Sequence, residues 1–240
     1  MTAPVSVAAP ARSELLAGLF PLGVCASESR LPIGRESLYV EEAQAVGGAS
    51  AKRASEFATG RLCARQVLAE LGVYGFPLRR NVDRSPRWPG GIVGSITHTV
   101  GFCGAVAVEQ RRFAGLGVDA EVTSRVTAEL WCQILTAAEK SALEDRAQED
   151  RAWRAAAIFS AKESFFKAQW PLTSRWIGFE EVEIELYPDV GDEHLGTFLV
   201  RPHSTARRGI FPFDAYAGRF RLDGNLVVTG IALEKAPVFP

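Results

Sequence analysis

The sequence predicts an α+β protein made of two pseudo-symmetric α/β lobes, each a small antiparallel sheet with a long helix. Two observations predict this class. Each half of the chain contains a strongly helical segment, at 51–72 and at 150–169. Short apolar or alternating segments that are typical of strands accompany each helix. We therefore expect an N-terminal lobe over residues 1–110, a C-terminal lobe over 111–240, and a functional site at their interface.

The first half contains one clear helix and two expected strands. Residues 51–72, AKRASEFATGRLCARQVLAELG, place apolar side chains such as Phe57 and Leu68 on one face, and Gly72 is a typical helix end. A loop rich in Pro, Gly and Arg follows at 76–91. The segments IVGSITH and GAVAV come next, and their apolar character predicts two strands.

The second half begins with another expected strand, FAGLGVDAE, at 113–121. Helical patterns follow over 127–149 and 150–169, and Pro171 is expected to end the second helix. The remainder returns to strand patterns. IGFEEVEIEL alternates with a period of two, GTFLV is short and apolar, and YAGRFRLDGNLVVTGIAL indicates a hairpin that turns at its Asp-Gly pair.

Composition excludes several classes of partner. The 240 residues are 47% hydrophobic and 23% charged, as in an ordinary globular protein. With 27 basic and 28 acidic side chains the net charge is -1, so no bulk positive field attracts nucleic acid or an anionic membrane. Residues 88–108 carry no charge, but Pro89 and five glycines interrupt them, which favours two strands over a membrane span. We expect neither a nucleic-acid nor a membrane partner.

The N-terminus and the cysteines indicate a cytoplasmic protein. The segment MTAPVSVAAPARSE lacks the basic start and the continuous apolar stretch of a signal peptide. The four cysteines form no CxxC pair and lie in apolar segments, which is typical of reduced core thiols.

Two carboxylates close the apolar strand GLGVDAE. Residues i and i+2 of a strand point to the same side, so Asp119 and Glu121 would project together and repel each other. A divalent cation relieves such repulsion, and Mg²⁺ prefers carboxylates together with water and phosphate oxygens. Taken alone, the pair is also compatible with a solvated strand end.

Charged residues also interrupt the apolar helix segment FSAKESFFK. Glu163 and Lys167 are one helical turn apart, and Lys162 precedes them. Because phenylalanines flank the three, we expect them at the border of a buried face. An i,i+4 ion pair on a solvated helix is the alternative interpretation.

One histidine and a group of basic residues precede the carboxylates. His98 ends the expected strand GSITH and is one of only three histidines. Guanidinium groups bind phosphate through paired hydrogen bonds, so basic residues close to a magnesium site favour a phosphate ligand. Solvated positive surface, and a structural histidine, are the alternatives. The basic residues are Lys52, Arg53, Arg61, Arg65, Arg79, Arg80, Arg84 and Arg87.

In chain order these segments resemble one family. The series FATGRLCA, PRWPGGIVGSITHT, GVDAE and FSAKESFFKAQWP is similar to the motifs of the 4'-phosphopantetheinyl transferases, of the two-lobed type that activates siderophore, nonribosomal peptide and polyketide synthases. The resemblance covers residues 50–171. It implies transfer of the 4'-phosphopantetheine arm of coenzyme A to a serine hydroxyl of an apo carrier protein, with release of 3',5'-ADP. Acyl, peptidyl and aryl carrier proteins or domains are the implied partners.

The resemblance also implies a metal and an assembly state. Mg²⁺, which Mn²⁺ can replace, would bridge the pyrophosphate of coenzyme A and the acidic residues Asp119, Glu121 and Glu163. Smaller relatives assemble as trimers, whereas a chain of this length supplies both lobes itself, so we expect a monomer.

Individual roles follow from matching positions. Glu163 is the expected general base, directly or through a water, with metal binding as its alternative role. Lys162, Lys167 and His98 match phosphate contacts, and the last two would act in catalysis with Glu163. The remaining positions match residues around the nucleotide: Arg53 and Arg61 at the 3'-phosphate, Arg80 where relatives often carry lysine, and Ser95 and Thr97 in the adjoining backbone.

Two further interpretations stay open at this point. A Mg²⁺-dependent phosphohydrolase or nuclease would use similar carboxylates, although it leaves the Arg-containing helix unexplained. A non-catalytic coenzyme-binding module is the other alternative. For the carrier-protein surface, the segment FFKAQWPLTSRW suggests Phe165, Gln169, Trp170 and the loop after Pro171.

Overall fold

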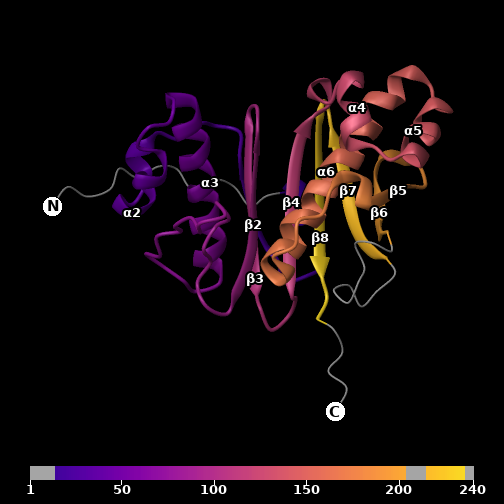
Figure 1. Ribbon diagram of the computed structural model, residues 1–240. Helices are drawn as coiled ribbons and strands as arrows, with labels where there is room; N and C mark the ends of the chain where they lie inside the picture. The colour runs from indigo at the N-terminus through magenta and orange to yellow at the C-terminus, as the bar shows by residue number, and fades with distance from the viewer. Residues whose placement is uncertain (1–13, 204–214, 236–240) are drawn as a thin grey trace, which may run out of the picture.

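The computed structural model describes residues 14–203 and 215–235, and within them eight strands form two antiparallel sheets (Figure 1). The expected α+β class, with two antiparallel sheets and long helices, is confirmed. The helices are α1 (Glu14–Ala17), α2 (Val40–Ala43), α3 (Ala51–Glu70), α4 (Ala128–Ile134), α5 (Ala137–Glu144) and α6 (Gln148–Thr173). The strands are β1 (Cys25–Ser29), β2 (Ile92–Thr99), β3 (Phe102–Glu109), β4 (Gly115–Val122), β5 (Val182–Asp189), β6 (Asp192–Pro202), β7 (Tyr216–Asp223) and β8 (Leu226–Leu233).

Each sheet belongs to one half of the chain. The first has three strands in the order β1-β3-β2, and the second has five in the order β4-β8-β7-β6-β5. Register in the first sheet pairs Ser95 with Val106, and in the second it pairs Asp119 with Thr229. The β7–β8 hairpin turns at Gly224 and Asn225, one residue later than the expected Asp-Gly pair, because Asp223 still pairs with Leu226. Gly224 has a positive φ of 63°, which suits a tight turn.

The sheets and long helices form layers in the order α3, three-stranded sheet, five-stranded sheet, α6 (Figure 1). Strand β3 is buried on both faces, which explains its continuous apolar sequence. Ala105 and Ala107 pack against α3, whereas Val106 and Val108 pack against β4 and β8 in a core that the two sheets share. Leucines of α1 belong to that shared core.

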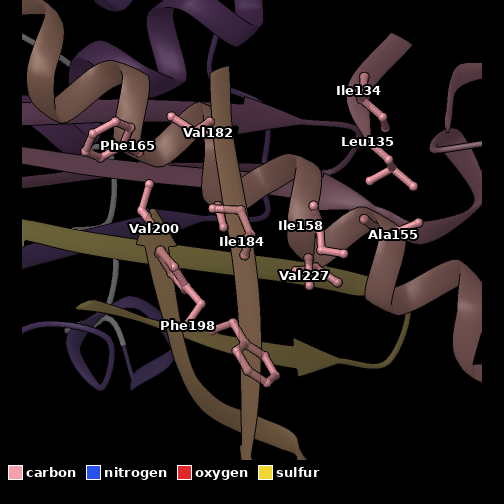
Figure 2. Packing of buried hydrophobic residues seen from close by; sticks show 14 of the residues in the cluster. Ile134, Leu135, Ala155, Ile158, Phe165, Val182, Ile184, Phe198, Val200 and Val227 are labelled. Carbon is pink, nitrogen blue, oxygen red and sulfur yellow. The ribbon is translucent and has the colours of Figure 1, made fainter. Parts of the chain in front are cut away.

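The largest core lies between α6 and the five-stranded sheet. Figure 2 shows Ile158 and Phe165 of α6 above strand residues that include Val200. Because this helix packs along its length on the sheet, the side chains on its edge are held rigidly relative to β4 and β8. Among the described helices, none is long and apolar enough to cross a bilayer.

Two local expectations need correction. Pro171 lies inside α6 instead of ending it, because a proline in the last turn removes only one hydrogen bond. The helix ends at Thr173, and the next residue, Ser174, is left-handed and donates its N–H to the Trp170 carbonyl at 2.9 Å. The helical pattern over 127–149 is divided between α4 and α5, since Thr136 caps a new helix.

The cysteines differ from one another in burial. Cys63 and Cys103 are buried, and burial raises the pKa of their thiols to about 11 and about 12, as expected of protonated core thiols. Cys132 is exposed on α4, so its apolar neighbours in sequence wrongly indicated a core position. Strand β1, which pairs Cys25 with Ala107, was not expected from the sequence.

Candidate functional site

Two glycines of β4 bring the strand unusually close to α6. A Cβ at Gly117 would lie 1.8 Å from the carbonyl oxygen of Ser164, and one at Gly115 would lie 2.3 Å from that of Ala168. Only glycine fits at such distances. Asp119 follows with the same strand alternation, so its carboxylate lies on the face that α6 covers. The apolar start of GLGVDAE therefore provides the close approach, and its acidic end faces the helix.

Asp119 is the centre of the contacts between the strand and the helix. Its Oδ1 accepts a hydrogen bond from Lys167 Nζ at 2.6 Å and one from Thr97 Oγ1 at 3.3 Å. The residue as a whole is 5% exposed. Among the residues that the structure describes, no donor reaches its other oxygen, Oδ2, although that atom is buried. An orphaned buried carboxylate oxygen is costly, which indicates that a ligand belongs there.

Two further carboxylates surround Asp119. Burial, followed by repulsion from Asp119, raises the pKa of Glu121 to about 7. Burial also raises the pKa of Glu163, and Asp119 adds to this shift while Lys167 opposes it. In the described part of the chain no three His, Cys, Asp or Glu side chains converge closely enough to form a metal site. The charges of the three carboxylates therefore influence one another, but their side chains do not form a complete set of ligands for a metal ion.

Strand β2 joins the two sheets beside this cluster. Ser95 Oγ accepts a hydrogen bond from the Val118 N–H at 3.1 Å, next to the contact between Thr97 and Asp119. Both hydroxyl residues are buried and face β4. Alternate residues face the other way, so Gly94 lies against Trp88 and Ile96 approaches Gly60 of α3. The segment GSITH thus connects the carboxylates on one side with the basic helix on the other.

A cleft of about 750 Å³ lies between α3, β2 and α6. The expected nucleotide residues Arg53, Arg61 and Arg80 all line it, as do Thr97, His98 and Lys167. Ser95 also contributes to its wall. A volume of this size is within the range of small-molecule and cofactor sites. One wall is therefore basic, and Lys167 connects the cleft with Asp119.

The basic wall is built on Phe57. The guanidinium carbon of Arg61 lies 4.0 Å from the centre of the Phe57 ring, and that of Arg80 lies 6.0 Å from it. Arg61 Nε donates to the Leu78 carbonyl at 2.8 Å. Burial lowers the pKa of Arg61 to about 10, and burial also lowers the pKa of Arg80. Both groups remain cations at neutral pH, so the wall carries concentrated positive charge that an anion would neutralise.

His98 lies at the rim of the cleft. Its Nε2 contacts Nη1 of Arg53, which also pairs with Glu56 at 3.4 Å. Desolvation lowers the pKa of the imidazole, and the cations Arg53 and Lys167 lower it further. An anionic ligand in the cleft would act in the opposite direction and favour the protonated form of the ring.

Aromatic side chains of α6 and of the segment that follows it form the opposite wall. Phe166 stacks on Trp170 with ring centres 5.5 Å apart and meets Trp176 edge-on at 5.1 Å, and all three line the cleft. Trp170 Nε1 donates to Asp83 Oδ2 at 2.6 Å, which links this wall to the Arg-rich loop across the cleft. That hydrogen bond lowers the pKa of Asp83.

Comparison with known proteins gives a consistent result. The model of the 4'-phosphopantetheinyl transferase N-terminal domain matches residues 41–108, and that of the 4'-phosphopantetheinyl transferase superfamily matches residues 115–206. The 4'-phosphopantetheinyl transferase Svp of Streptomyces mobaraensis is 38% identical over 198 residues, which are 82% of this chain and 78% of Svp. The chain belongs to the 4'-phosphopantetheinyl transferase superfamily.

Two other members of the superfamily align over similar lengths. The 4'-phosphopantetheinyl transferase Npt of Nocardia iowensis is 33% identical over 221 residues, 85% of this chain and 98% of Npt. The 4'-phosphopantetheinyl transferase PptT of Mycobacterium tuberculosis is 35% identical over 196 residues, 80% of this chain and 85% of PptT. The match to the superfamily model includes both Asp119 and Glu163.

Lys162 lies elsewhere than expected in this superfamily member. It is 2% exposed, and its Nζ donates to Glu139 Oε2 at 2.7 Å and to the carbonyls of Ile134 and Phe179 at 3.0 and 2.7 Å. An ammonium has three donors, and all three are used. The expectation that Lys162 contacts a phosphate is therefore in disagreement with the geometry, because the side chain points into the core and not into the cleft.

The suggested carrier-protein surface also needs correction. Phe165 is 1% exposed and packs against Tyr216, and Gln169 is fully buried and donates to the Arg175 carbonyl. Neither side chain can contact a docking protein. Trp170 is partly exposed and lines the cleft, as part of the aromatic wall described above.

Sequence reasoning missed several residues of the site. Phe166 and Trp176 were not predicted to line the cleft. Their positions close to the charged motif residues in sequence could have indicated a cleft wall with both aromatic and charged side chains. Asp83 was overlooked because it is one acid within an Arg-rich loop. Glu42 lies behind the basic wall, and nothing in its local sequence distinguishes it from exposed acids such as Glu41.

Proposed function

We propose that this chain transfers the 4'-phosphopantetheine arm of coenzyme A to a serine hydroxyl of an apo carrier protein and releases 3',5'-ADP. The observation that carries the proposal is a cleft whose arginine wall meets Lys167, which in turn binds the half-satisfied carboxylate of Asp119 behind the cleft lining. A cation cluster suits the phosphates of a nucleotide, and the adjoining acids suit a metal ion at a diphosphate. Membership of the superfamily supports the same activity.

The basic wall is proposed as the site of the nucleotide end. Arg53 and Arg61 would bind the 3'-phosphate, with Arg80 contributing positive charge beside them. The shared position of Arg61 and Arg80 around Phe57 supports this role, since arginines held close to one another are stabilised by an anionic ligand. The backbone at Ser95 and Thr97 would form the floor next to the nucleotide.

The acidic cluster fits a divalent cation. Asp119 and Glu121 would hold Mg²⁺, or Mn²⁺ in its place, and Glu163 lies close enough to influence the same site electrostatically. The orphaned Oδ2 of Asp119 supports this assignment, because a cation would satisfy it and relieve the repulsion with Glu121. When bound, the metal would neutralise negative charge on the diphosphate.

The protein's own side chains supply the remaining chemistry. The carrier serine is a weak nucleophile near neutral pH, and Glu163, whose carboxylate has a raised pKa, would accept its proton directly or through a water. The serine oxygen forms a bond to the β-phosphorus while the bond from that phosphorus to the 3',5'-ADP oxygen breaks. Lys167 and His98 would donate hydrogen bonds to the phosphate oxygens as charge develops on them.

The organisation of the protein follows the same proposal. Residues 1–110 would form the lobe that recognises the nucleotide, and residues 111–240 the lobe that carries the acidic and KES motifs.

We further propose a cytoplasmic monomer that serves acyl, peptidyl or aryl carrier domains of siderophore, nonribosomal peptide or polyketide synthases. Analytical ultracentrifugation at micromolar concentration tests the monomer directly, and a trimer would contradict it.

A direct experiment tests the proposed activity. The protein is incubated with coenzyme A, Mg²⁺ and an apo carrier protein, and the carrier is then weighed by mass spectrometry. A gain equal to one phosphopantetheine arm, absent when the carrier serine is replaced by alanine, supports transfer. Breakdown of the coenzyme without modification of the carrier would instead indicate a phosphohydrolase, and binding without either change would indicate a coenzyme-binding module.

A further inference from the structure

A buried carboxylate without a role in the proposed mechanism lies behind the basic wall. Glu42 of α2 is fully buried. Its Oε1 accepts a hydrogen bond from the Leu78 N–H at 2.9 Å, and its Oε2 accepts one from Arg65 Nη1 at 2.8 Å and one from the Tyr39 N–H at 3.0 Å. A buried charge is tolerated only when it is paired, and here three donors occupy both oxygens.

The backbone of Leu78 connects this carboxylate to Arg61. Its N–H donates to Glu42, and its carbonyl accepts from Arg61 Nε at 2.8 Å. Leu78 is itself fully buried and lies two residues before Arg80 in the same loop. The backbone of this one residue is therefore held by Glu42 on one side and orients the Arg61 guanidinium on the other.

Helix α3 provides a second connection. Arg61 and Arg65 are four residues apart, so they lie on the same face one turn apart. Arg65 Nη2 also donates to the Ser37 carbonyl at 2.9 Å, which holds its guanidinium beside Glu42. With Nε of Arg61 bonded to Leu78 and its guanidinium stacked on Phe57, the terminal nitrogens of Arg61 are the part that remains for a ligand.

The charge of Glu42 also acts on Arg61. Burial is the main reason that the pKa of Arg61 falls to about 10, and Arg80, Arg65 and Arg53 lower it further. The negative charge of Glu42 raises it. Its carboxylate therefore offsets the crowding of cations from the side opposite the cleft.

We propose that Glu42 is a positioning residue that aims Arg61 at the 3'-phosphate of coenzyme A through the backbone of Leu78. The inference rests on the proposed function, since it takes the 3'-phosphate as the ligand of Arg61. In this role Glu42, and with it α2, contributes to the preference of the protein for coenzyme A over an analogue that lacks the 3'-phosphate. A purely structural Glu42 would stabilise the fold and leave this discrimination unchanged.

Calorimetric titration with coenzyme A and with dephospho-coenzyme A tests the proposal. We expect the preference for coenzyme A to fall about tenfold in Glu42→Gln, the size of effect typical of charged hydrogen bonds. The Arg61→Met variant should lose the same preference, and adding Glu42→Gln to it should cause no further loss. Glu41→Gln, which changes an exposed neighbour in the same helix, is the matched control and should keep the wild-type preference.

The outcomes separate the two proposals. Unchanged discrimination in Glu42→Gln, or additive losses in the double variant, overturns the positioning role alone. Wild-type protein that binds both ligands equally would overturn the proposed phosphate site and this inference with it. If Glu42→Gln does not fold, Glu42→Asp provides the measurement, because it keeps the charge beside Arg65 but is one methylene shorter. Reduced discrimination in Glu42→Asp supports the proposal, and wild-type discrimination overturns it.

Discussion

Lys167 of α6 and Asp119 of β4 form an ion pair in which Nζ and Oδ1 are 2.6 Å apart, at the point where the helix crosses the strand. The pair is only partly shielded from solvent, with 28% of the Lys167 side chain and 7% of the Asp119 side chain exposed. It leaves Oδ2 of Asp119 without a protein donor among the described residues. The carboxylate thus has one oxygen for the protein and one for a ligand.

Replacing Asp119 by asparagine should abolish turnover while coenzyme binding persists. Asparagine preserves the shape of the side chain but removes the negative charge that a divalent cation requires. Single-turnover transfer to an apo carrier, followed by mass spectrometry, measures the chemical step, and calorimetry with coenzyme A measures binding. Retention of wild-type turnover at saturating Mg²⁺ would remove Asp119 from the metal site.

Arg53→Ala should chiefly weaken coenzyme binding. Its guanidinium lines the cleft beside His98, and a charged hydrogen bond of this kind contributes about 1.5 to 3 kcal/mol. We expect KM for coenzyme A to rise while kcat changes little. Lys52→Ala, at an exposed position next to it on the same helix, is the control. Equal loss of kcat in Arg53→Ala and Asp119→Asn would contradict a division between nucleotide recognition and chemistry.

Lys162→Met should destabilise the fold. It leaves Glu139 buried without its partner, which typically costs about 3 to 5 kcal/mol when one half of a buried pair is removed. Urea unfolding measures the loss. The double variant Lys162→Met with Glu139→Gln should recover part of it. A large loss of coenzyme affinity in Lys162→Met without a loss of stability would restore the phosphate contact expected from the motif.

Gly117→Ala should impair both stability and catalysis. The added methyl group would meet the Ser164 carbonyl, so α6 must move away from β4 and carry Glu163 and Lys167 with it. Overpacking of this kind typically costs about 1 to 3 kcal/mol. Thermal unfolding and kcat are the measurements, and Gly48→Ala, where a Cβ would meet open space, is the control. Wild-type values for both quantities in Gly117→Ala would refute the close approach.

Trp170→Ala should raise KM for the carrier protein, about tenfold if the indole is an anchor of the docking surface. Trp170→Phe separates two contributions, because it keeps a ring to stack on Phe166 and loses the hydrogen bond to Asp83. Val190→Ala, at an exposed turn outside the cleft, is the control. An unchanged KM in Trp170→Ala would exclude the indole from the interface.

The sequence predicted the elements of the site better than the orientation of individual side chains. Strand alternation predicted that Asp119 and Glu121 project to the same side of the strand, and in the structure the charge of Asp119 contributes to the raised pKa of Glu121. Neighbouring helical residues, by contrast, differ by about 100° around the axis. Lys162 therefore points into the core while Glu163 lies near the carboxylates, and Phe165 is buried while Phe166 lines the cleft.

Residues whose partners are distant in sequence were the hardest to interpret. The partner of Lys162 is Glu139 on another helix, and Glu42 is recognisable as special only once Leu78 and Arg65 lie beside it. Local pattern contains no information about such contacts. Pro171 was misinterpreted for a different reason. The effect of a proline depends on its distance from the end of the helix, and only two helical residues follow Pro171 in α6.

The apolar core that β3, β4, β8 and α1 share makes the two halves of the molecule mutually dependent. Cutting the chain between β3 and β4 would leave each fragment with an exposed apolar surface. The fragments should therefore aggregate when expressed separately and reassemble when expressed together. For the same reason we expect the two sheets to move together, so that the cleft does not open by a hinge rotation of one sheet relative to the other.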